Sequence, residues 1–135
     1  MAIHEQVWVK VNAEVDKGMA RIVAALSSID GLRTLQSCEH SQDGESYLHF
    51  WYGSWEQTAD LVFGKIVPAL ESAGISATGA VEVFNGSSPT GRIGFSAAAL
   101  EKATAAIEAL VPTVSGCDRS SVSARDTEYR AQAGY

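Results

Sequence analysis

The spacing of the apolar residues changes from a period of two to a period of about 3.6 near the start of the chain, and this change constrains the fold most. Apolar residues alternate over Val7–Val11, which is typical of a strand with one buried face. Over residues 19–29 they fall at helical spacing, with Asp16 placed to cap the helix and Asp30-Gly31 to end it. The chain is therefore expected to begin with a strand followed by a helix.

The rest of the chain continues to alternate between strand and helix patterns. A polar turn around Gly44 separates two predicted strands, and Ser54 begins a segment with capping-box spacing. Pro68 lies inside the helical pattern that follows and is expected to distort the helix one turn earlier, near Gly64. In chain order the predicted elements are strands at 32–38 and 47–52, a helix at 54–74, strands at 75–84 and 92–95, and a helix at 96–112.

This order predicts an α+β fold of the ferredoxin-like type, the split βαβ arrangement β-α-β-β-α-β, extended by a further strand and a C-terminal helix. The chain has 135 residues, of which 46% are hydrophobic, and this suits one compact domain, placed at residues 1–112. Residues 113–135 are polar without a sustained period and are predicted to form a C-terminal tail.

The third predicted strand, Tyr47–Tyr52, is apolar or aromatic on both faces. Tyr47, His49 and Trp51 form the second face, in a sheet that helices should cover on one side only. That face either lines a ligand groove or is a subunit interface. We expect a homodimer or larger assembly that buries this face, or Trp8 of the first strand.

The balance of charge disfavours several classes of partner. Ten basic against sixteen acidic residues give a net charge of −6, so direct nucleic-acid binding is not expected, because phosphate contacts need clustered Lys and Arg. Apolar runs end before membrane-spanning length and the N-terminus lacks a secretion-signal pattern, so no membrane partner is expected. With two cysteines, Cys38 and Cys117, the chain is predicted to be a cytoplasmic protein with reduced thiols.

The segment Glu14–Ser41 carries a series of helix, turn and strand residues: Val15-Asp16, Ile22-Val23, Ser28, Asp30-Gly31, Thr34 and Ser37-Cys38. In this order and without a gap they resemble the opening of the tRNA wybutosine-synthesis methyltransferase family. That family continues with Gly-Arg where this chain has His40-Ser41. The resemblance implies a related start of the fold and, as an alternative function, an enzyme that modifies RNA or nucleotides.

The run Ser37-Cys38-Glu39-His40 places a nucleophile, an acid and a base side by side. A reactive thiolate needs a nearby base or positive charge, which His40 or His49 of the next strand could supply. The same Cys38, His40 and His49 could instead hold a metal ion. A third alternative is a packed cysteine beside polar residues at the end of a hairpin. No catalytic residue, metal ligand or cofactor is assigned from the sequence.

We expect a ligand site where the second and third predicted strands meet the loop Ser87–Arg92. The predicted site residues are Ser37, Cys38, His40, His49, Trp51 and Arg92. Trp51 is the expected apolar wall and Arg92 the expected anion contact. The predicted function is a small acidic, non-enzymatic binding protein for a small polar or anionic, nucleotide-like ligand or a protein partner. Compact acidic domains of this kind occur among phage accessory and anti-defence proteins.

Overall fold

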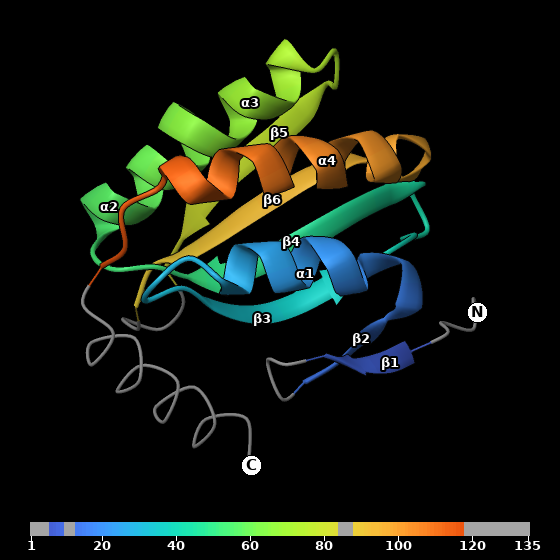
Figure 1. Cartoon of the computed structure of the whole chain (residues 1–135), viewed down its shortest axis with the longest axis horizontal. Helices are drawn as coiled ribbons and strands as arrows, with labels where there is room; N and C mark the ends of the chain where they lie inside the picture. Colours follow the sequence, from blue (N-terminus) through green and yellow to red (C-terminus); the bar gives the residue numbers. More distant parts are fainter. Residues whose placement is uncertain (1–5, 10–12, 84–87, 118–135) are drawn as a thin grey trace.

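Helices cover one face of a four-stranded sheet, and a separate two-stranded hairpin lies beside it (Figure 1). This architecture is seen in a computed structural model, which describes residues 6–9, 13–83 and 88–117. The strands are β1 (Gln6–Val9), β2 (Ala13–Asp16), β3 (Arg33–Cys38), β4 (Glu45–Trp51), β5 (Ala77–Glu82) and β6 (Thr90–Ser96). The helices are α1 (Ala20–Ser27), α2 (Trp55–Ala59), α3 (Val67–Ser72) and α4 (Leu100–Leu110), with a π-helical segment, Asp60–Ile66, that joins α2 to α3.

The main sheet has the order β3-β4-β6-β5, and every neighbouring pair is antiparallel. The predicted α+β class is confirmed, but the ferredoxin-like order is not. A split βαβ sheet includes the first strand, whereas among the described strands β1 pairs only with β2. The last predicted strand, β6, lies in the middle of the sheet and does not extend its edge. Period-two spacing identifies a strand but not its partners, so the pattern could not reveal this pairing.

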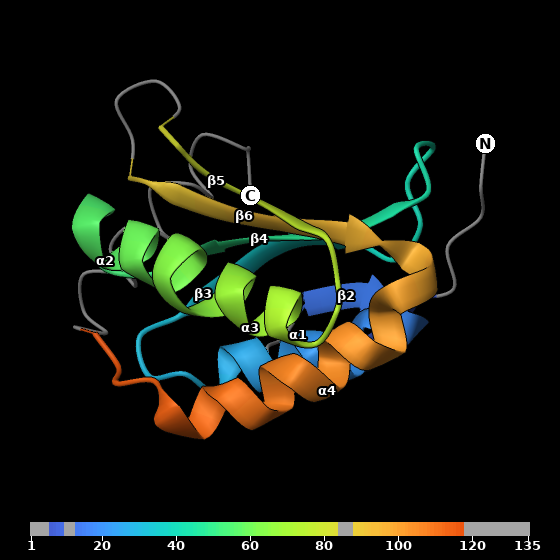
Figure 2. The same cartoon turned by 90° about the horizontal axis from the view of Figure 1, so that it is seen from above.

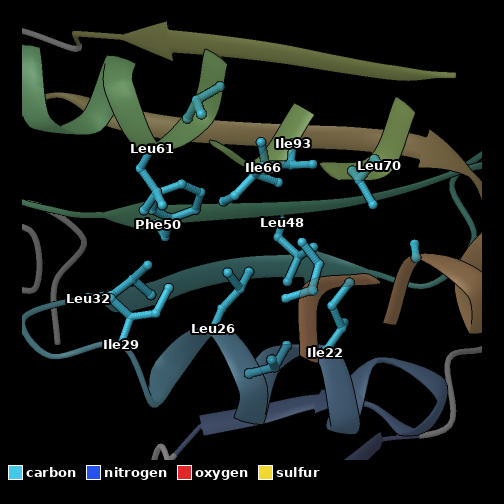
Figure 3. Close-up of a cluster of buried hydrophobic side chains, with 14 of the residues drawn as sticks. Ile22, Leu26, Ile29, Leu32, Leu48, Phe50, Leu61, Ile66, Leu70 and Ile93 are labelled. Carbon is cyan, nitrogen blue, oxygen red and sulfur yellow. The ribbon is translucent and has the colours of Figure 1, made fainter. Parts of the chain in front are cut away.

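The hydrophobic core lies between the sheet and the helices (Figures 2 and 3). Leu48 and Phe50 of β4 and Ile93 of β6 are at most 1% exposed. Gly91 lies against the ring of Phe50, where a Cβ atom would come within 2.7 Å of Cζ, so the ring requires glycine at this position. The helical segments and the turn after α1 contribute the labelled residues Ile22, Leu26, Ile29, Leu61, Ile66 and Leu70.

Local signals in the sequence predicted the ends of the helices. Ser54 and Gln57 form the expected capping box at the start of α2. Gly31 has a φ of 86° in the turn that follows α1. Pro68 lies in the first turn of α3, and the preceding segment Asp60–Ile66 is π-helical, which is the distortion expected around Gly64.

The beginning of the predicted tail packs on the domain. Tyr52 donates a hydrogen bond from its hydroxyl to the carbonyl oxygen of Ser115, and Cys117 N donates to Asp30 O at 2.9 Å. Residues 118–135 lie outside the described part of the chain. Within the described ranges, no helix combines the length and the apolar character that a membrane span requires.

Candidate functional site

The face of the sheet that points away from the helices, here called the open face, carries most residues of the predicted site. None of the described helices lies on this side (Figure 2). The strand registers place there Gln36 and Cys38 of β3, Glu45, Tyr47, His49 and Trp51 of β4, Thr90 and Arg92 of β6, and Thr78, Ala80 and Glu82 of β5.

Four of these residues form a connected group, here called the Arg92 cluster: Glu45, Tyr47, His49 and Arg92. Arg92 Nη2 lies 2.5 Å from Glu45 Oε1. The guanidinium carbon lies 5.2 Å from the centre of the Tyr47 ring, within the range of a cation–π contact. The ring centres of Tyr47 and His49 are 5.4 Å apart, and His49 is directly opposite Arg92 in the ladder. All four side chains are partly buried, so the cluster is ordered yet reachable from solvent.

Gly94 makes room for this arrangement. It pairs with Tyr47, and a Cβ atom at Gly94 would lie 2.7 Å from the carboxyl carbon of Glu45. The carboxylate of Glu45 therefore lies across the glycine backbone, where it reaches Arg92. A side chain at position 94 would require this carboxylate to move.

Burial makes both rings of the cluster prefer their neutral forms. The pKa of His49 is lowered first by burial and then by the charge of Arg92, while Glu82 acts in the opposite direction. The pKa of Tyr47 is raised mainly by burial and next by Cys38, while Arg92 opposes the rise. At neutral pH the Arg92 cluster therefore combines one ion pair with two uncharged rings that can donate and accept hydrogen bonds.

Four of the six predicted site residues lie together on the open face: Cys38, His49, Trp51 and Arg92. Cys38 is opposite Tyr47, so it is a diagonal neighbour of His49 and does not face it directly. Trp51 is not an accessible wall, because it is 3% exposed and its Nε1 donates to Thr90 Oγ1 at 3.2 Å. The accessible rings of this face are those of Tyr47 and His49.

The other two predicted residues, Ser37 and His40, lie elsewhere. Ser37 is opposite Leu48, whose side chain is in the core, so it is on the other face from Cys38. Strand β3 ends at Cys38 and the chain then bends, so His40 is exposed beyond the strand and the register does not place it on the open face with Cys38. Among the described residues no group of three His, Cys, Asp or Glu could hold a metal ion. Ser87 and the side chain of Trp8 lie outside the described part of the chain.

Ser37 instead lines a cleft of about 250 Å³ at the outer edge of β3. The cleft is lined by Val15, Val23, Thr34, Leu35, Gln36, Ser37 and Tyr47. Leu35 is the bulge residue, because the register with β4 shifts between Thr34 and Gln36. The cleft is smaller than most ligand pockets, which measure about 300–1,000 Å³, and it contains no charged side chain. The Arg92 cluster is therefore the stronger candidate for a polar ligand.

Asp16 and Glu39 have a structural role that the sequence did not reveal. The side chain of Asp16 makes no capping hydrogen bond to the following helix, contrary to expectation, and its Oδ2 accepts from Glu39 N at 2.9 Å. In return, Glu39 Oε1 accepts from Gly18 N at 2.8 Å. This reciprocal pair, here called the Asp16–Glu39 clip, ties the end of β2 to the end of β3. No local pattern in the sequence signals this pair, because the two acids are 23 positions apart.

No family model matches the chain, and comparisons with curated proteins and with solved structures give no match. The resemblance of Glu14–Ser41 to the wybutosine-synthesis methyltransferases therefore stays a prediction. What the chain binds is inferred below from the geometry of the open face.

Proposed function

We propose that this chain is a non-enzymatic binding protein that holds a small anionic, nucleotide-like ligand on the Arg92 cluster. The observation that supports this most directly is the position of the Arg92 guanidinium. Its ion pair with Glu45 holds it over the ring of Tyr47 and next to His49. The cluster thus offers an oriented cation and two rings on a surface that no described helix covers.

Arg92 can bind an anion while it keeps its ion pair. A guanidinium carries five N–H donors, and the hydrogen bond to Glu45 uses Nη2. The ion pair also holds the planar group in one orientation, which reduces the entropy lost when a ligand binds. Because two phosphate oxygens can accept parallel hydrogen bonds from one guanidinium, a phosphate monoester suits this group well.

Tyr47 and His49 provide a surface for the planar part of the ligand. Stacking of a base on an aromatic side chain contributes about 1–3 kcal/mol in proteins that bind single strands. A single nucleotide suits the site better than a long nucleic acid, because a net charge of −6 repels a polyanion. An anion beside His49 also opposes the effect of burial on its pKa, so binding should be accompanied by proton uptake below neutral pH.

The test compares two arginines that form similar ion pairs. Arg92 Nη2 lies 2.5 Å from Glu45 on the open face, and Arg21 Nη2 lies 2.6 Å from Glu108 between α1 and α4. Binding of adenosine monophosphate is measured by calorimetry and by NMR shift changes, with inorganic phosphate as a second probe. Arg92→Gln should weaken binding by about 1–3 kcal/mol, the range for a charge-assisted hydrogen bond, and Arg21→Gln should leave it unchanged.

Two results would contradict the proposal. One is equal losses of affinity in the two arginine variants, which would place the ligand elsewhere. The other is that none of the four common ribonucleoside monophosphates binds at millimolar concentration. Binding of phosphate as tightly as adenosine monophosphate would contradict the stacking role of Tyr47 and His49.

The alternative function, an enzyme that modifies RNA or nucleotides, is favoured by the position of Cys38. This thiol is opposite Tyr47 and so lies beside the proposed nucleotide site, where such an enzyme would need its nucleophile. The reactivity of Cys38 toward alkylation separates the two functions. Either function is consistent with the cytoplasm, where thiols such as those of Cys38 and Cys117 stay reduced.

A further inference from the structure

Large exposed apolar side chains of the described chain occur next to β5 and on the helical segments that pack against it. Three large hydrophobic residues are exposed, Trp55 at 48%, Phe63 at 51% and Val83 at 50%, and they are the only such residues among 15–83 and 88–117, the residues whose burial is described. Val83 directly follows β5, and Phe63 packs over Gly79, where a Cβ atom would be 3.2 Å from its Cε1. Trp55 begins α2, which also packs against β5. These residues and strand β5 are here called the β5 edge.

The backbone of this edge is also suited to pairing. Strand β5 pairs with β6 on one side, and no other described strand lies on its outer side (Figure 1). Its register with β6 is regular, and its sequence Ala-Thr-Gly-Ala-Val-Glu contains no Pro, Lys or Arg. Edge strands that lack bulges, prolines and basic residues are templates for a further strand. The exposed backbone and the apolar side chains are two separate observations that indicate the same surface.

We propose that a second copy of this chain pairs with the β5 edge, so that two β5 strands run antiparallel about a two-fold axis. Directly opposed residues of antiparallel strands share a face, which limits the possible registers. A two-fold axis through Ala80 pairs the whole of β5 with β5 of the second copy. It places Thr78 opposite Glu82 of the second copy and Ala77 opposite Val83 of the second copy. The two sheets then become one continuous sheet with the helices of both copies on the same side.

The distribution of charge makes the β5 edge a better place for self-association than most of the surface. A chain with a net charge of −6 repels its copy, so the contact needs a region where like charges do not meet. In this register Glu82 faces a threonine hydroxyl. The two Glu82 residues are separated by about four residues of strand, roughly 13 Å, which exceeds the Debye length of about 8 Å at physiological salt.

The apolar area is sufficient for a weak but specific dimer. Large side chains that are half exposed leave roughly 100 Å² each in water, so three per copy supply about 600 Å² over both copies. Non-obligate interfaces are a little more than half apolar, which implies a total of about 1,000 Å², near the lower limit for a specific interface. We therefore expect a dissociation constant in the micromolar range.

This contact replaces the expected assembly through Tyr47, His49 and Trp51. Trp51 is buried within its own chain, and Tyr47 and His49 are half-buried, whereas the side chains of the β5 edge are exposed. Pairing at β5 leaves the open face of both copies uncovered. The dimer therefore does not depend on the proposed ligand, and each can fail without the other.

Sedimentation equilibrium over a range of protein concentrations tests the dimer. The original chain should dimerise, and Phe63→Glu should raise the dissociation constant about tenfold or more, because it buries a charge against the second copy. Ala109→Glu, at an exposed position of α4, is the matched control and should leave the dissociation constant unchanged. Circular dichroism confirms that each variant is folded.

A pair of variants at the exposed residue Thr78 tests the register. In Thr78→Glu the new carboxylate of each copy lies opposite Glu82 of the other copy. This repulsion occurs at two symmetric places and should weaken the dimer. Thr78→Lys places an amine opposite Glu82 of the second copy twice and should strengthen it. The proposal is overturned by a monomer at tens of micromolar, by a dimer that Phe63→Glu leaves intact, or by equal effects of the two Thr78 variants. Loss of the dimer in Tyr47→Asp but not in Phe63→Glu would place the contact on the open face.

Discussion

The two edges of the sheet are built in opposite ways. At β3 the strand carries a bulge at Leu35, the β1–β2 hairpin lies alongside, and the Asp16–Glu39 clip holds it there (Figure 1). At β5 the register is regular and large hydrophobic side chains are exposed. Bulges and covering segments keep an edge strand from pairing with another chain. The β3 edge is therefore protected, whereas the β5 edge keeps its backbone available.

The comparison separates interactions that stabilise the folded chain from those that allow association. The clip at β3 is formed by residues of one chain, and Asp16 is 4% exposed, so its loss is expected to lower the free energy of unfolding. The apolar residues at β5 are half exposed in the single chain, so replacing them should chiefly change the dimer dissociation constant.

Removal of the clip should have the largest effect on stability. Asp16→Ala removes a buried carboxylate and leaves the partly buried Glu39 N–H without this acceptor, so the free energy of unfolding should fall by about 2–3 kcal/mol. Urea unfolding at neutral pH measures this change. Asp43→Ala, in the exposed turn between β3 and β4, is the control and should stay within about 0.5 kcal/mol. A loss no larger than the control's would mean that the clip does not secure the β3 edge.

Acid should destabilise the protein through His49, which lies on β4 between the two edges. Its pKa is lowered in the folded protein by burial and by Arg92, so the unfolded chain takes up the proton first, near the ordinary pKa of about 6.5. The contribution of His49 to stability is complete above about pH 6.5 and is lost as the pH falls toward the lowered pKa of the folded state. Urea unfolding at about pH 7.5 and pH 5 should show this loss.

Two variants test whether His49 causes the loss of stability at low pH. His49→Gln should show a smaller loss of stability between the two pH values than the original chain. Arg92→Gln should also reduce the loss, because it removes the second cause of the lowered pKa of His49. If His49→Gln keeps the full pH dependence, groups other than His49 control it.

Substitution of Cys38, on the protected β3 edge, should have the smallest effect on the free energy of unfolding. It is half-buried opposite Tyr47, and Cys38→Ser should cost about 1 kcal/mol or less while binding of adenosine monophosphate is retained. Alkylation of the folded protein at neutral pH compares it with Cys117, which is also half-buried. Cys38 should react no faster than Cys117. Much faster reaction of Cys38, with loss of binding in Cys38→Ser, would favour the nucleotide-modifying enzyme.

The elements of the fold could largely be predicted from local patterns, but their pairing could not. The capping box at Ser54, the turn at Gly31 and the irregular helix before Pro68 involve residues within one or two helical turns, and each was confirmed. Strand β2 was missed because four residues are too few to show a clear alternation. The bulge at Leu35 was missed for a related reason, since one extra residue changes the register without changing the composition.

The candidate site was predicted only in part for the same physical reason. Alternation on one strand correctly placed Tyr47 and His49 on a face of their own, because that requires no knowledge of other strands. Ser37, Cys38 and His40 were expected to converge at one site, but the register of β3 places Ser37 and Cys38 on opposite faces, and His40 lies beyond the end of the strand. Trp51 could not be recognised as buried from its position in the strand, because its exposure depends on its surroundings in three dimensions.

By itself the sequence determined most of the helices and strands in their order, though not β2, and the aromatic second face of β4, because periodicity and capping act among near neighbours. Only the tertiary structure decided which distant residues meet. Arg92 and Glu45 are 47 positions apart and Asp16 and Glu39 are 23 apart, yet each pair is joined by a hydrogen bond. It also decided that β6 lies inside the sheet and β5 at its edge. Such contacts depend on strand pairing and register, which no local pattern of residues specifies.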